Sequence, residues 1–276
     1  MTEPASVSVI IPCYRCSATI RRAVQSVIEQ TITPKEILLI DDCSSDGGET
    51  INSLFTLQRN FPNSNIKIFS LPKNGGPAVA RNAGWEAATQ PYIAFLDADD
   101  AWHPRKIEIQ YNWMKSHPEI SLSGHLIKVL SIMPKTSPNI GPLSSRKLHQ
   151  WEWLLLCRFS TISVMLHRDI PFRFNPNNRY AEDYLLWLRI VLNDYDTWRI
   201  EIPLAFCFKP LYGAGGLSRD LWMSEKGEIN TYQQIYLEGL IPFIIYVILS
   251  FVSLLKYIKR LIVVFFRNIY GMDSRN

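Results

Sequence analysis

Four clusters of polar residues each follow a short apolar run in the first hundred residues, and this order constrains how the chain can fold. The apolar runs are residues 7–11, 36–40, 66–69 and 92–96, and the clusters read PCYR, DDCSSD, PKNGG and DADD. The segments between these runs have apolar residues at helical spacing, as in residues 17–30. Strands that alternate with helices form a mostly parallel sheet covered on both faces. The sequence therefore predicts an α/β fold.

The polar clusters predict where such a fold would bind a ligand. Open parallel sheets bind ligands beyond the carboxyl ends of their strands. Because all four clusters stand at that end of a predicted strand, we expect them to line one crevice. Beyond residue 118 the pattern is looser, with strands expected in residues 120–130 and 162–166, helices at 149–157 and 181–192, and a polar loop at 175–179.

Composition excludes several classes of protein. The 276 residues are 47% hydrophobic and 20% charged, as in an ordinary globular protein, and a net charge of +4 is too mild for a nucleic-acid-binding surface. No G-x-G-x-x-G follows the first run, so the pattern of a dinucleotide-dependent dehydrogenase is missing. The N-terminal residues lack the basic and long apolar segments of a signal peptide, and we expect the protein on the cytoplasmic side.

The cysteines point to a reducing compartment. Five are present, an odd number, so a disulfide framework is not indicated. Cys13 and Cys16 form a C-x-x-C, but no second pair completes a zinc site.

The acids after the fourth run suggest a metal site. Asp97, Asp99 and Asp100 lie within four residues, and like charges this close raise one another's pKa unless a cation lies among them. Mg²⁺ and Mn²⁺ take carboxylate oxygens and share substrate phosphates. The alternative is an acidic turn in which Asp100 caps the next helix.

Three further groups could act with these acids. Asp41 and Asp42 could accept hydrogen bonds from a base or ribose, or could form an Asx turn. Lys73 and Arg81 could contact a diphosphate, or could be solvated charges at a helix start. Glu182 and Asp183 lie in the first turn of a predicted helix, where a carboxylate could take a proton from a hydroxyl or could cap the helix.

Taken together, these segments resemble one family. The order VSVIIPCY, ILLIDDCSSDGG, KNGGPAVARNAGW, YIAFLDADDAWHPRKIEIQ and AEDYLLWLR is similar to that of the inverting, GT-A-fold glycosyltransferases of family 2, over roughly residues 5–215. The resemblance implies a Rossmann-like sheet flanked by helices, a nucleotide-sugar donor, with UDP the commonest nucleotide, and a Mn²⁺ or Mg²⁺ cofactor.

The resemblance also implies roles for residues. Pro12, Tyr14 and Asp42 would line the nucleoside pocket, Asp97 and Asp99 would form the D-x-D pair with Asp99 on the metal, and Asp183 would be the catalytic base beside Glu182. The other donor contacts expected are Asp41, Lys73, Arg81, Ala98 and Arg219. Two departures from the family pattern are Cys43, where many members have glycine, and the lack of a histidine in residues 211–222, where some members bind the metal.

The C-terminal tail bears on the acceptor. Residues 239–255 carry no charge, and residues 239–276 together carry a net charge of +4, which equals that of the whole chain. In a continued helix, a basic face toward lipid would be formed by Lys256, Lys259, Arg260 and Arg267. Seventeen residues are short for a membrane span, so an interfacial helix is favoured, and a helical hairpin packed on the domain is the alternative. A transferase held at the membrane is well placed for a lipid-linked or glycan acceptor at the cytoplasmic face of the inner membrane. In this the chain resembles bacterial enzymes that build surface polysaccharide such as O-antigen or capsule.

These expectations divide the chain into three parts. Residues 1–118 would bind the nucleotide-sugar, residues 119–225 would bind the acceptor and carry the base, and residues 226–276 would be the membrane-associated tail. Two other functions remain open on the sequence: a metal-dependent nucleotidyltransferase, and a catalytically inactive membrane-tethered scaffold. We expect no nucleic-acid partner.

Overall fold

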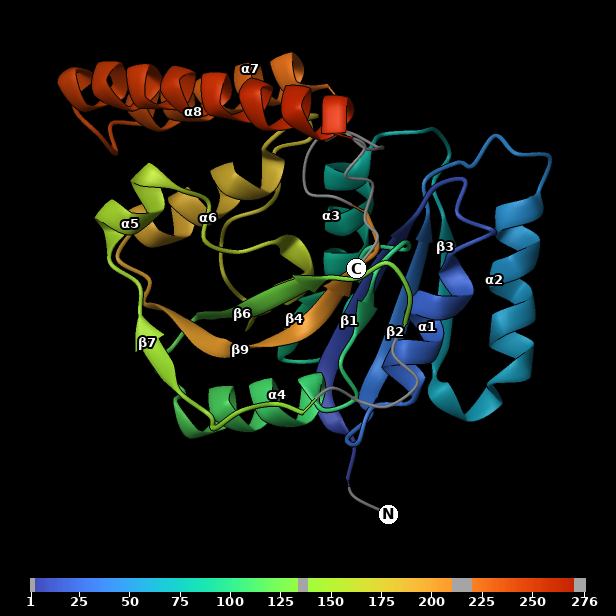
Figure 1. Ribbon diagram of the computed structural model, residues 1–276. Coiled ribbons are helices and arrows are strands. Elements are labelled where there is room, and N and C mark those ends of the chain that lie inside the picture. The colour runs from blue at the N-terminus through green and yellow to red at the C-terminus, as the bar shows by residue number, and fades with distance from the viewer. Residues whose placement is uncertain (1–2, 134–138, 210–219, 271–276) are drawn as a thin grey trace.

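The structure is a computed structural model that describes residues 3–133, 139–209 and 220–270, with side chains described as far as residue 266. Figure 1 shows the helices and strands in chain order. They are β1 (Ala5–Cys13), α1 (Ile20–Ile28), β2 (Pro34–Asp41), α2 (Glu49–Asn60), η1 (Pro62–Ser64), β3 (Ile66–Ser70), α3 (Pro77–Ala87), β4 (Tyr92–Phe95), β5 (Ala101–Trp102), α4 (Lys106–Ser116), β6 (Leu122–Val129), β7 (Ser145–Lys147), α5 (Gln150–Leu155), η2 (Thr161–Ser163), β8 (Met165–His167), α6 (Glu182–Leu192), β9 (Thr197–Cys207), α7 (Leu221–Leu237) and α8 (Phe243–Tyr270).

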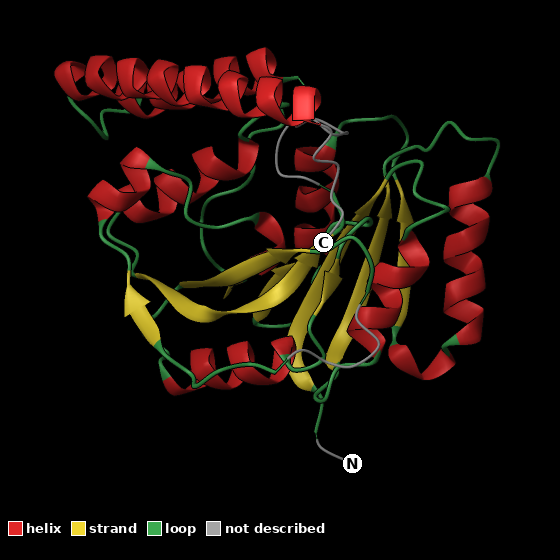
Figure 2. Ribbon diagram, in the orientation of Figure 1, coloured by secondary structure: helices red, strands yellow, loops and turns green. Residues whose placement is uncertain are grey.

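The first four strands form a parallel half-sheet. They lie in the order β3-β2-β1-β4, and every pairing among them is parallel. Their carboxyl ends therefore meet at one edge, as the order of the apolar runs predicts. Figure 2 shows the arrowheads of this half-sheet pointing to the upper end of the view.

The second half of the sheet is mixed, which corrects the prediction of a mostly parallel sheet. β8 pairs antiparallel with β4 and β6, and β9 pairs parallel with β6 but antiparallel with β5 and β7. Parallel neighbours need a crossover of a dozen or more residues, usually a helix. The regular alternation of strand and helix stops after residue 118, so the rule that holds for the first half does not extend to the second.

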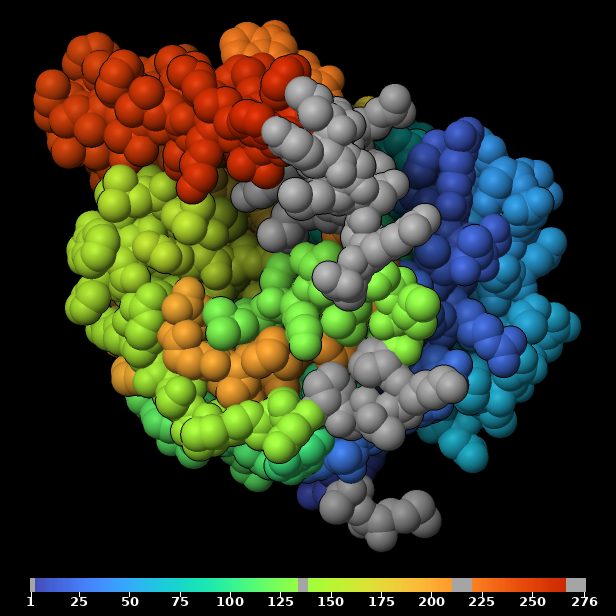
Figure 3. All heavy atoms as spheres, viewed as in Figure 1, coloured from blue at the N-terminus to red at the C-terminus, as the bar shows by residue number. Residues whose placement is uncertain are grey.

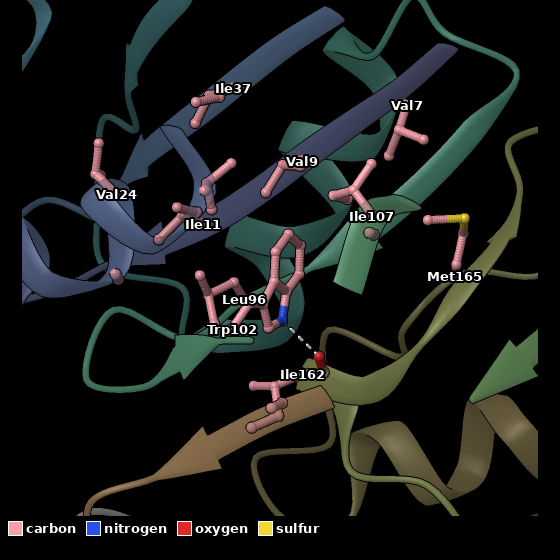
Figure 4. Close-up of a cluster of buried hydrophobic side chains, with 14 of the residues drawn as sticks. Val7, Val9, Ile11, Val24, Ile37, Leu96, Trp102, Ile107, Ile162 and Met165 are labelled. Carbon is pink, nitrogen blue, oxygen red and sulfur yellow. Dashed lines mark hydrogen bonds between the residues drawn. The ribbon is translucent and has the colours of Figure 1, made fainter. Parts of the chain in front are cut away.

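Apolar side chains fill both faces of the sheet because successive residues of a strand point to opposite sides. On β1, Val7, Val9 and Ile11 join the core under α1, α2 and α4, whereas Ile10 joins the core under α3 and α6. Figure 4 shows the first core around Trp102, whose indole N–H donates to the Ile162 carbonyl at 2.8 Å.

Several predicted elements differ from those in the structure. The first helix begins at Ile20 rather than residue 17, and the Ser17 hydroxyl donates to Glu49 of α2. Of the predicted strand 162–166, the first residues form the turn η2 and the strand is Met165–His167. The strand β9 was not predicted, and no bounds were given for the helix after Asp100, which is α4. Lys106 and Gln110 are buried on α4, and these polar residues interrupt the apolar spacing by which a helix is recognised.

The C-terminal region forms a pair of packed helices. The chain turns at Gly239, which has a φ of 75°, and α8 then runs back along α7. Lys256 and Arg260 of α8 form ion pairs with Glu228 of α7, and Arg260 also pairs with Glu225. These residues thus form the hairpin that the sequence offered as an alternative. Among the described helices, none has the length and hydropathy needed to cross a bilayer.

Candidate active site

A cavity of about 990 Å³ opens at the carboxyl ends of β1, β2 and β4. It is lined by residues from segments far apart in the chain, including the loop after β1, the start of α3, the DADD segment, the start of α6 and the residues after β9. The predicted site residues on its wall are Pro12, Tyr14, Asp42, Arg81, Asp97, Ala98, Asp99, Glu182 and Asp183. The crevice inferred from the strand ends is therefore present.

The three acids after β4 have different environments. Asp97 and Asp99 are half-buried, and each forms an ion pair. Asp97 pairs with Arg81 at 2.8 Å, and Asp99 pairs with Lys209 at 2.6 Å. Asp100 is buried, and one of its carboxylate oxygens has no partner among the described residues. Burial, reinforced by the charges of Asp97 and Asp99, raises the pKa of Asp100 to about 8. The two ion pairs thus compensate the charges of Asp97 and Asp99, and burial favours the neutral form of Asp100.

Arg81 joins the acid cluster to the helix that carries the predicted base. Its buried guanidinium donates to Asp97 and, at 2.8 Å, to Glu182 at the start of α6. Burial opposes its charge, but the two carboxylates raise the pKa of Arg81. The sequence predicts that Arg81 contacts a diphosphate. In the structure Arg81 lines the cavity, but its guanidinium is already paired with two carboxylates.

The first turn of α6 presents Asp183 to the cavity. Ala181 precedes the helix with a left-handed φ of 54°, which turns the chain into α6. Thr161 donates to one oxygen of Asp183 at 3.0 Å, and the Tyr184 amide donates to the other at 2.8 Å. Burial raises the pKa of Asp183 and, together with the charge of Asp183, raises the pKa of Glu182 to about 7. Such shifts suit a carboxylate that must take up a proton.

Asp42 anchors the glycine-rich loop on the opposite wall. Its two oxygens accept from the amides of Gly75 and Gly76 at 2.8 and 2.7 Å, and the Asn74 side chain donates at 2.9 Å. Gly76 adopts a φ of 81°, which glycine tolerates best, and Pro77 then begins α3. Asp42 therefore shapes the loop as well as lining the cavity.

The loop after β1 forms the remaining wall. Tyr14 is exposed, and Arg15 donates to Ser45 in the DDCSSD turn, so that the loops after β1 and β2 are joined. Cys13 and Cys16 are buried free cysteines that line this wall. Within the described ranges, no group of three or more His, Cys, Asp or Glu residues is arranged to hold a metal, so the C-x-x-C belongs to no such cluster.

Two of the predicted donor contacts lie away from the cavity wall, and a third is not described. Asp41 is buried, and its carboxylate accepts from the Ser44 amide at 3.2 Å, which is the Asx turn offered as its alternative. Lys73 is exposed at the surface and is not among the lining residues. Arg219 lies outside the described residues.

Other residues on the wall were not predicted. Lys209, Thr161, Arg15, Asn74 and Arg179 all line the cavity. Lys209 follows β9, and the strand-end rule used for the first four strands would have found it had β9 been recognised.

The acid cluster fits a hard divalent cation in part. Asp97 and Asp99 offer carboxylate oxygens at the cavity, and the buried oxygen of Asp100 lacks a partner within the described ranges. Two carboxylates are enough for Mg²⁺ when substrate phosphates and water supply the other ligands. Lys209 already neutralises Asp99, so a cation there would compete with its ammonium group.

Comparison with known proteins gives a consistent result. The family model described as glycosyl transferase family 2 matches residues 8–178. The Escherichia coli protein named UDP-Glc:alpha-D-GlcNAc-diphosphoundecaprenol beta-1,3-glucosyltransferase WfgD is 33% identical over 187 residues, which cover 67% of this chain and 69% of WfgD. The Bacillus subtilis protein named putative teichuronic acid biosynthesis glycosyltransferase TuaG is 30% identical over 201 residues, covering 72% of this chain and 77% of TuaG.

A solved structure agrees with the architecture. The mannosyltransferase PcManGT from Pyrobaculum calidifontis, determined with GDP-Man and Mn²⁺, superposes with a TM-score of 0.66 at 17% identity, covering 95% of this chain and 75% of that chain. At this identity the likeness concerns the fold, which is GT-A: a mixed sheet between layers of helices.

Proposed function

Since the chain belongs to glycosyl transferase family 2, we propose that it moves a sugar from a nucleotide-sugar, most simply a UDP-sugar, to a hydroxyl of a lipid-linked or glycan acceptor, with inversion at the anomeric carbon. The observation that carries this proposal is that the acids after β4 and those at the start of α6 line a single cavity. The names of WfgD and TuaG support a role in bacterial surface polysaccharide synthesis, and that of WfgD supports UDP-sugar and a diphospholipid-linked acceptor.

Asp183 would act as the general base. The acceptor hydroxyl loses its proton to the Asp183 carboxylate while its oxygen attacks the anomeric carbon from the face opposite the diphosphate. The bond to the diphosphate oxygen breaks with its electron pair, so one displacement inverts the configuration and no enzyme nucleophile is needed. General-base catalysis of this kind contributes roughly 10²- to 10⁴-fold in rate.

The opposite side of the cavity would hold the nucleoside diphosphate. Tyr14 and Pro12 offer an exposed ring and an apolar surface for the nucleoside, next to the loop that Asp42 anchors. Arg15 and Arg179 are exposed cations on the wall, whereas Arg81 is engaged by two carboxylates. We therefore assign diphosphate contacts to these two arginines rather than to Lys73 or Arg81.

Asp97 and Asp99 would hold Mg²⁺ or Mn²⁺, which supplies positive charge to the leaving diphosphate. Support for a metal comes from the two carboxylates that Asp97 and Asp99 offer at the cavity and from the Mn²⁺ complex of PcManGT. Lys209 would leave Asp99 when the ion binds, and its ammonium group would then be free to face the phosphates.

A donor screen tests the proposal. The full chain is incubated with Mn²⁺, a polyprenyl-diphosphate-linked sugar and UDP-, GDP- or dTDP-sugars in turn, and the released nucleotide is measured. We expect one donor class to give the free nucleoside diphosphate, and NMR of the product to show the inverted anomer. Release of pyrophosphate would instead indicate a nucleotidyltransferase. A product that retains the anomeric configuration of the donor would exclude a mechanism with a single displacement.

Binding of a nucleotide-sugar distinguishes an enzyme from a catalytically inactive scaffold. We expect at least one nucleotide-sugar to bind in calorimetry with Mn²⁺ present, and the Asp183→Asn variant to bind it with similar affinity. If no nucleotide-sugar binds, the cavity has another use.

A further inference from the structure

α8 carries an apolar stripe along one side of its described length. Except for Val263, its exposed large apolar residues recur every three or four positions, the spacing that places side chains on one face of a helix. We call this the α8 stripe: Phe243, Ile244, Val247, Ile248, Phe251, Leu254, Leu255, Ile258, Leu261, Ile262, Phe265 and Phe266. With a rise of about 1.5 Å per residue, the 28-residue helix is roughly 42 Å long. Figure 3 shows α8 at the outer rim of the molecule.

The opposite side of α8 is attached to the protein. Leu249 and Ser253 are buried there, and Lys256 and Arg260 pair with the glutamates of α7. This corrects the sequence prediction that these two cations form a basic face toward lipid. Their charges hold the helix in place, and this orientation turns the stripe away from the domain.

The charges around the stripe favour an anionic partner. The sequence of α8 contains no acidic residue. Lys259 is exposed and follows Ile258 of the stripe, so its ammonium group can reach an anionic headgroup while its stem lies along the apolar surface.

Aromatic side chains flank the stripe as they do at membrane interfaces. Trp222 of α7 packs against Tyr257 of α8 with ring centroids 5.6 Å apart, and its ring is half exposed. Tryptophan and tyrosine are enriched where apolar tails meet polar headgroups. A second copy of the chain would gain the apolar contact but would offer Lys259 no acid from its own α8, so lipid is the better match.

The active-site cavity reaches α7, the helix against which α8 packs. Ser224 lines the cavity, and it lies two residues after Trp222 on the same helix. A membrane that contacts the α8 stripe would therefore lie close to the cavity.

We propose that α8 binds the surface of an anionic bilayer and lies parallel to it, with the α8 stripe at the boundary between headgroups and acyl chains. Interfacial helices with an apolar face and a basic rim bind in this way. The cytoplasmic leaflet is the anionic one, which agrees with the expected location of the protein. The idea that a membrane lipid is the acceptor rests on the proposed function. The proposal that α8 binds a bilayer does not.

Vesicle flotation tests the binding with the full chain. We expect the protein to float with vesicles of equal parts phosphatidylglycerol and phosphatidylcholine, and the Phe251→Ser/Ile258→Ser variant to lose at least tenfold in partitioning. Ile132→Ser is the matched control, because Ile132 is an exposed apolar residue outside the stripe and should leave partitioning unchanged. Lys259→Glu should weaken binding to the anionic vesicles more than to pure phosphatidylcholine vesicles.

Two results would overturn the proposal. Wild-type protein that stays unbound, or a double variant that floats like wild type, would exclude the stripe as a lipid-binding surface. Dimers that light scattering detects in the wild type and not in the double variant, without vesicle binding, would assign the stripe to a second copy. Hydrolysis of the donor in solution is measured in parallel. Absence of hydrolysis by the wild-type protein would count against the proposed function. If α8 binds lipid, the double variant should still hydrolyse the donor but should no longer float with the vesicles.

Discussion

Arg81 and Glu182 form a buried ion pair at 2.8 Å although 101 residues separate them in the chain. The same guanidinium pairs with Asp97, so one side chain joins the acid cluster after β4 to the first turn of α6. Its positive charge also opposes protonation of Glu182 and Asp183, whose pKa values burial raises. Arg81 is therefore placed to position both groups of carboxylates and to keep the base ionised.

Replacing Arg81 with methionine should shift the pH profile of transfer. Without the guanidinium the pKa values of Glu182 and Asp183 rise further, so the base is protonated over a wider range and kcat/KM falls most at low pH. An opposite charge at this distance changes a carboxyl pKa by roughly 1–3 units, so the acid limb should move up by about one unit or more. The measurement is kcat/KM against pH at fixed metal concentration.

A companion variant separates this effect from general damage to the fold. Glu182→Gln removes a negative charge next to Asp183, so its acid limb should move to lower pH. If both variants move the limb in the same direction, the charge of Arg81 does not control the base. Circular dichroism checks folding, because an unpaired buried charge costs about 3–5 kcal/mol.

Asp183→Asn should slow transfer severely and leave donor binding nearly intact. The amide has the shape of the carboxylate but cannot take the proton, so the rate should fall by roughly 10²- to 10⁴-fold. Single-turnover transfer and donor binding by calorimetry are measured together. Asp169→Asn, at an exposed aspartate, is the matched control. Transfer near the wild-type rate would remove Asp183 from the mechanism.

The site was predictable from sequence where the strand-end rule applied. The four apolar runs all form parallel strands of the sheet, with only Leu96 lying beyond the end of its strand, β4. Short apolar runs separated by helical segments leave little choice of topology. Of the acids that follow these runs, Asp42, Asp97, Asp99 and Asp100 therefore line one cavity. Their partners were not predictable: nothing local indicates that Arg81 meets Glu182, since only the folded chain brings α3 and α6 together.

The second half of the chain was harder for a physical reason. β9 carries Pro203, which lowers the strand propensity of a segment whose Ile200, Ile202 and Leu204 are buried at every second position. α4 buries Lys106 on the face of Trp102, with the ammonium 3.8 Å from the ring centroid, where an apolar residue would be expected. Tertiary contacts stabilise both elements against a weak local pattern. Because β9 was not predicted, Lys209, which follows it, was not predicted as a site residue either.

Replacing Lys209 with methionine should tighten the binding of Mn²⁺ to the protein without donor. Burial favours the neutral amine, but the ion pair with Asp99 raises the pKa of Lys209, and that ammonium competes with a metal for the same carboxylate. Calorimetry or Mn²⁺ electron paramagnetic resonance gives the dissociation constant directly. Lys226→Met, on an exposed lysine of α7, is the control. An unchanged or weaker affinity for Mn²⁺ would mean that Asp99 does not hold the ion.

Gly227→Ala should destabilise the protein and slow transfer, although alanine favours a helix. A Cβ at position 227 would lie 2.6 Å from the Cβ of Tyr180 and 2.9 Å from its carbonyl oxygen, so α7 and the loop before α6 must separate. Overpacking costs about 1–3 kcal/mol, more than the roughly 1 kcal/mol that alanine gains over glycine in a helix. Thermal unfolding should therefore begin a few degrees lower.

The effect on activity follows from what the loop carries. Tyr180 is followed by Ala181, whose left-handed backbone sets the direction of α6, and a shift there moves Asp183 relative to the acid cluster. We expect kcat to fall more than the KM for the donor rises, because Asp42 and the loops after β1 and β2 lie on the other wall. Gly141→Ala, where no atom lies within 4 Å of the added Cβ, should change neither quantity. A higher melting temperature with unchanged kcat for Gly227→Ala would show that the close approach of α7 does not position the base.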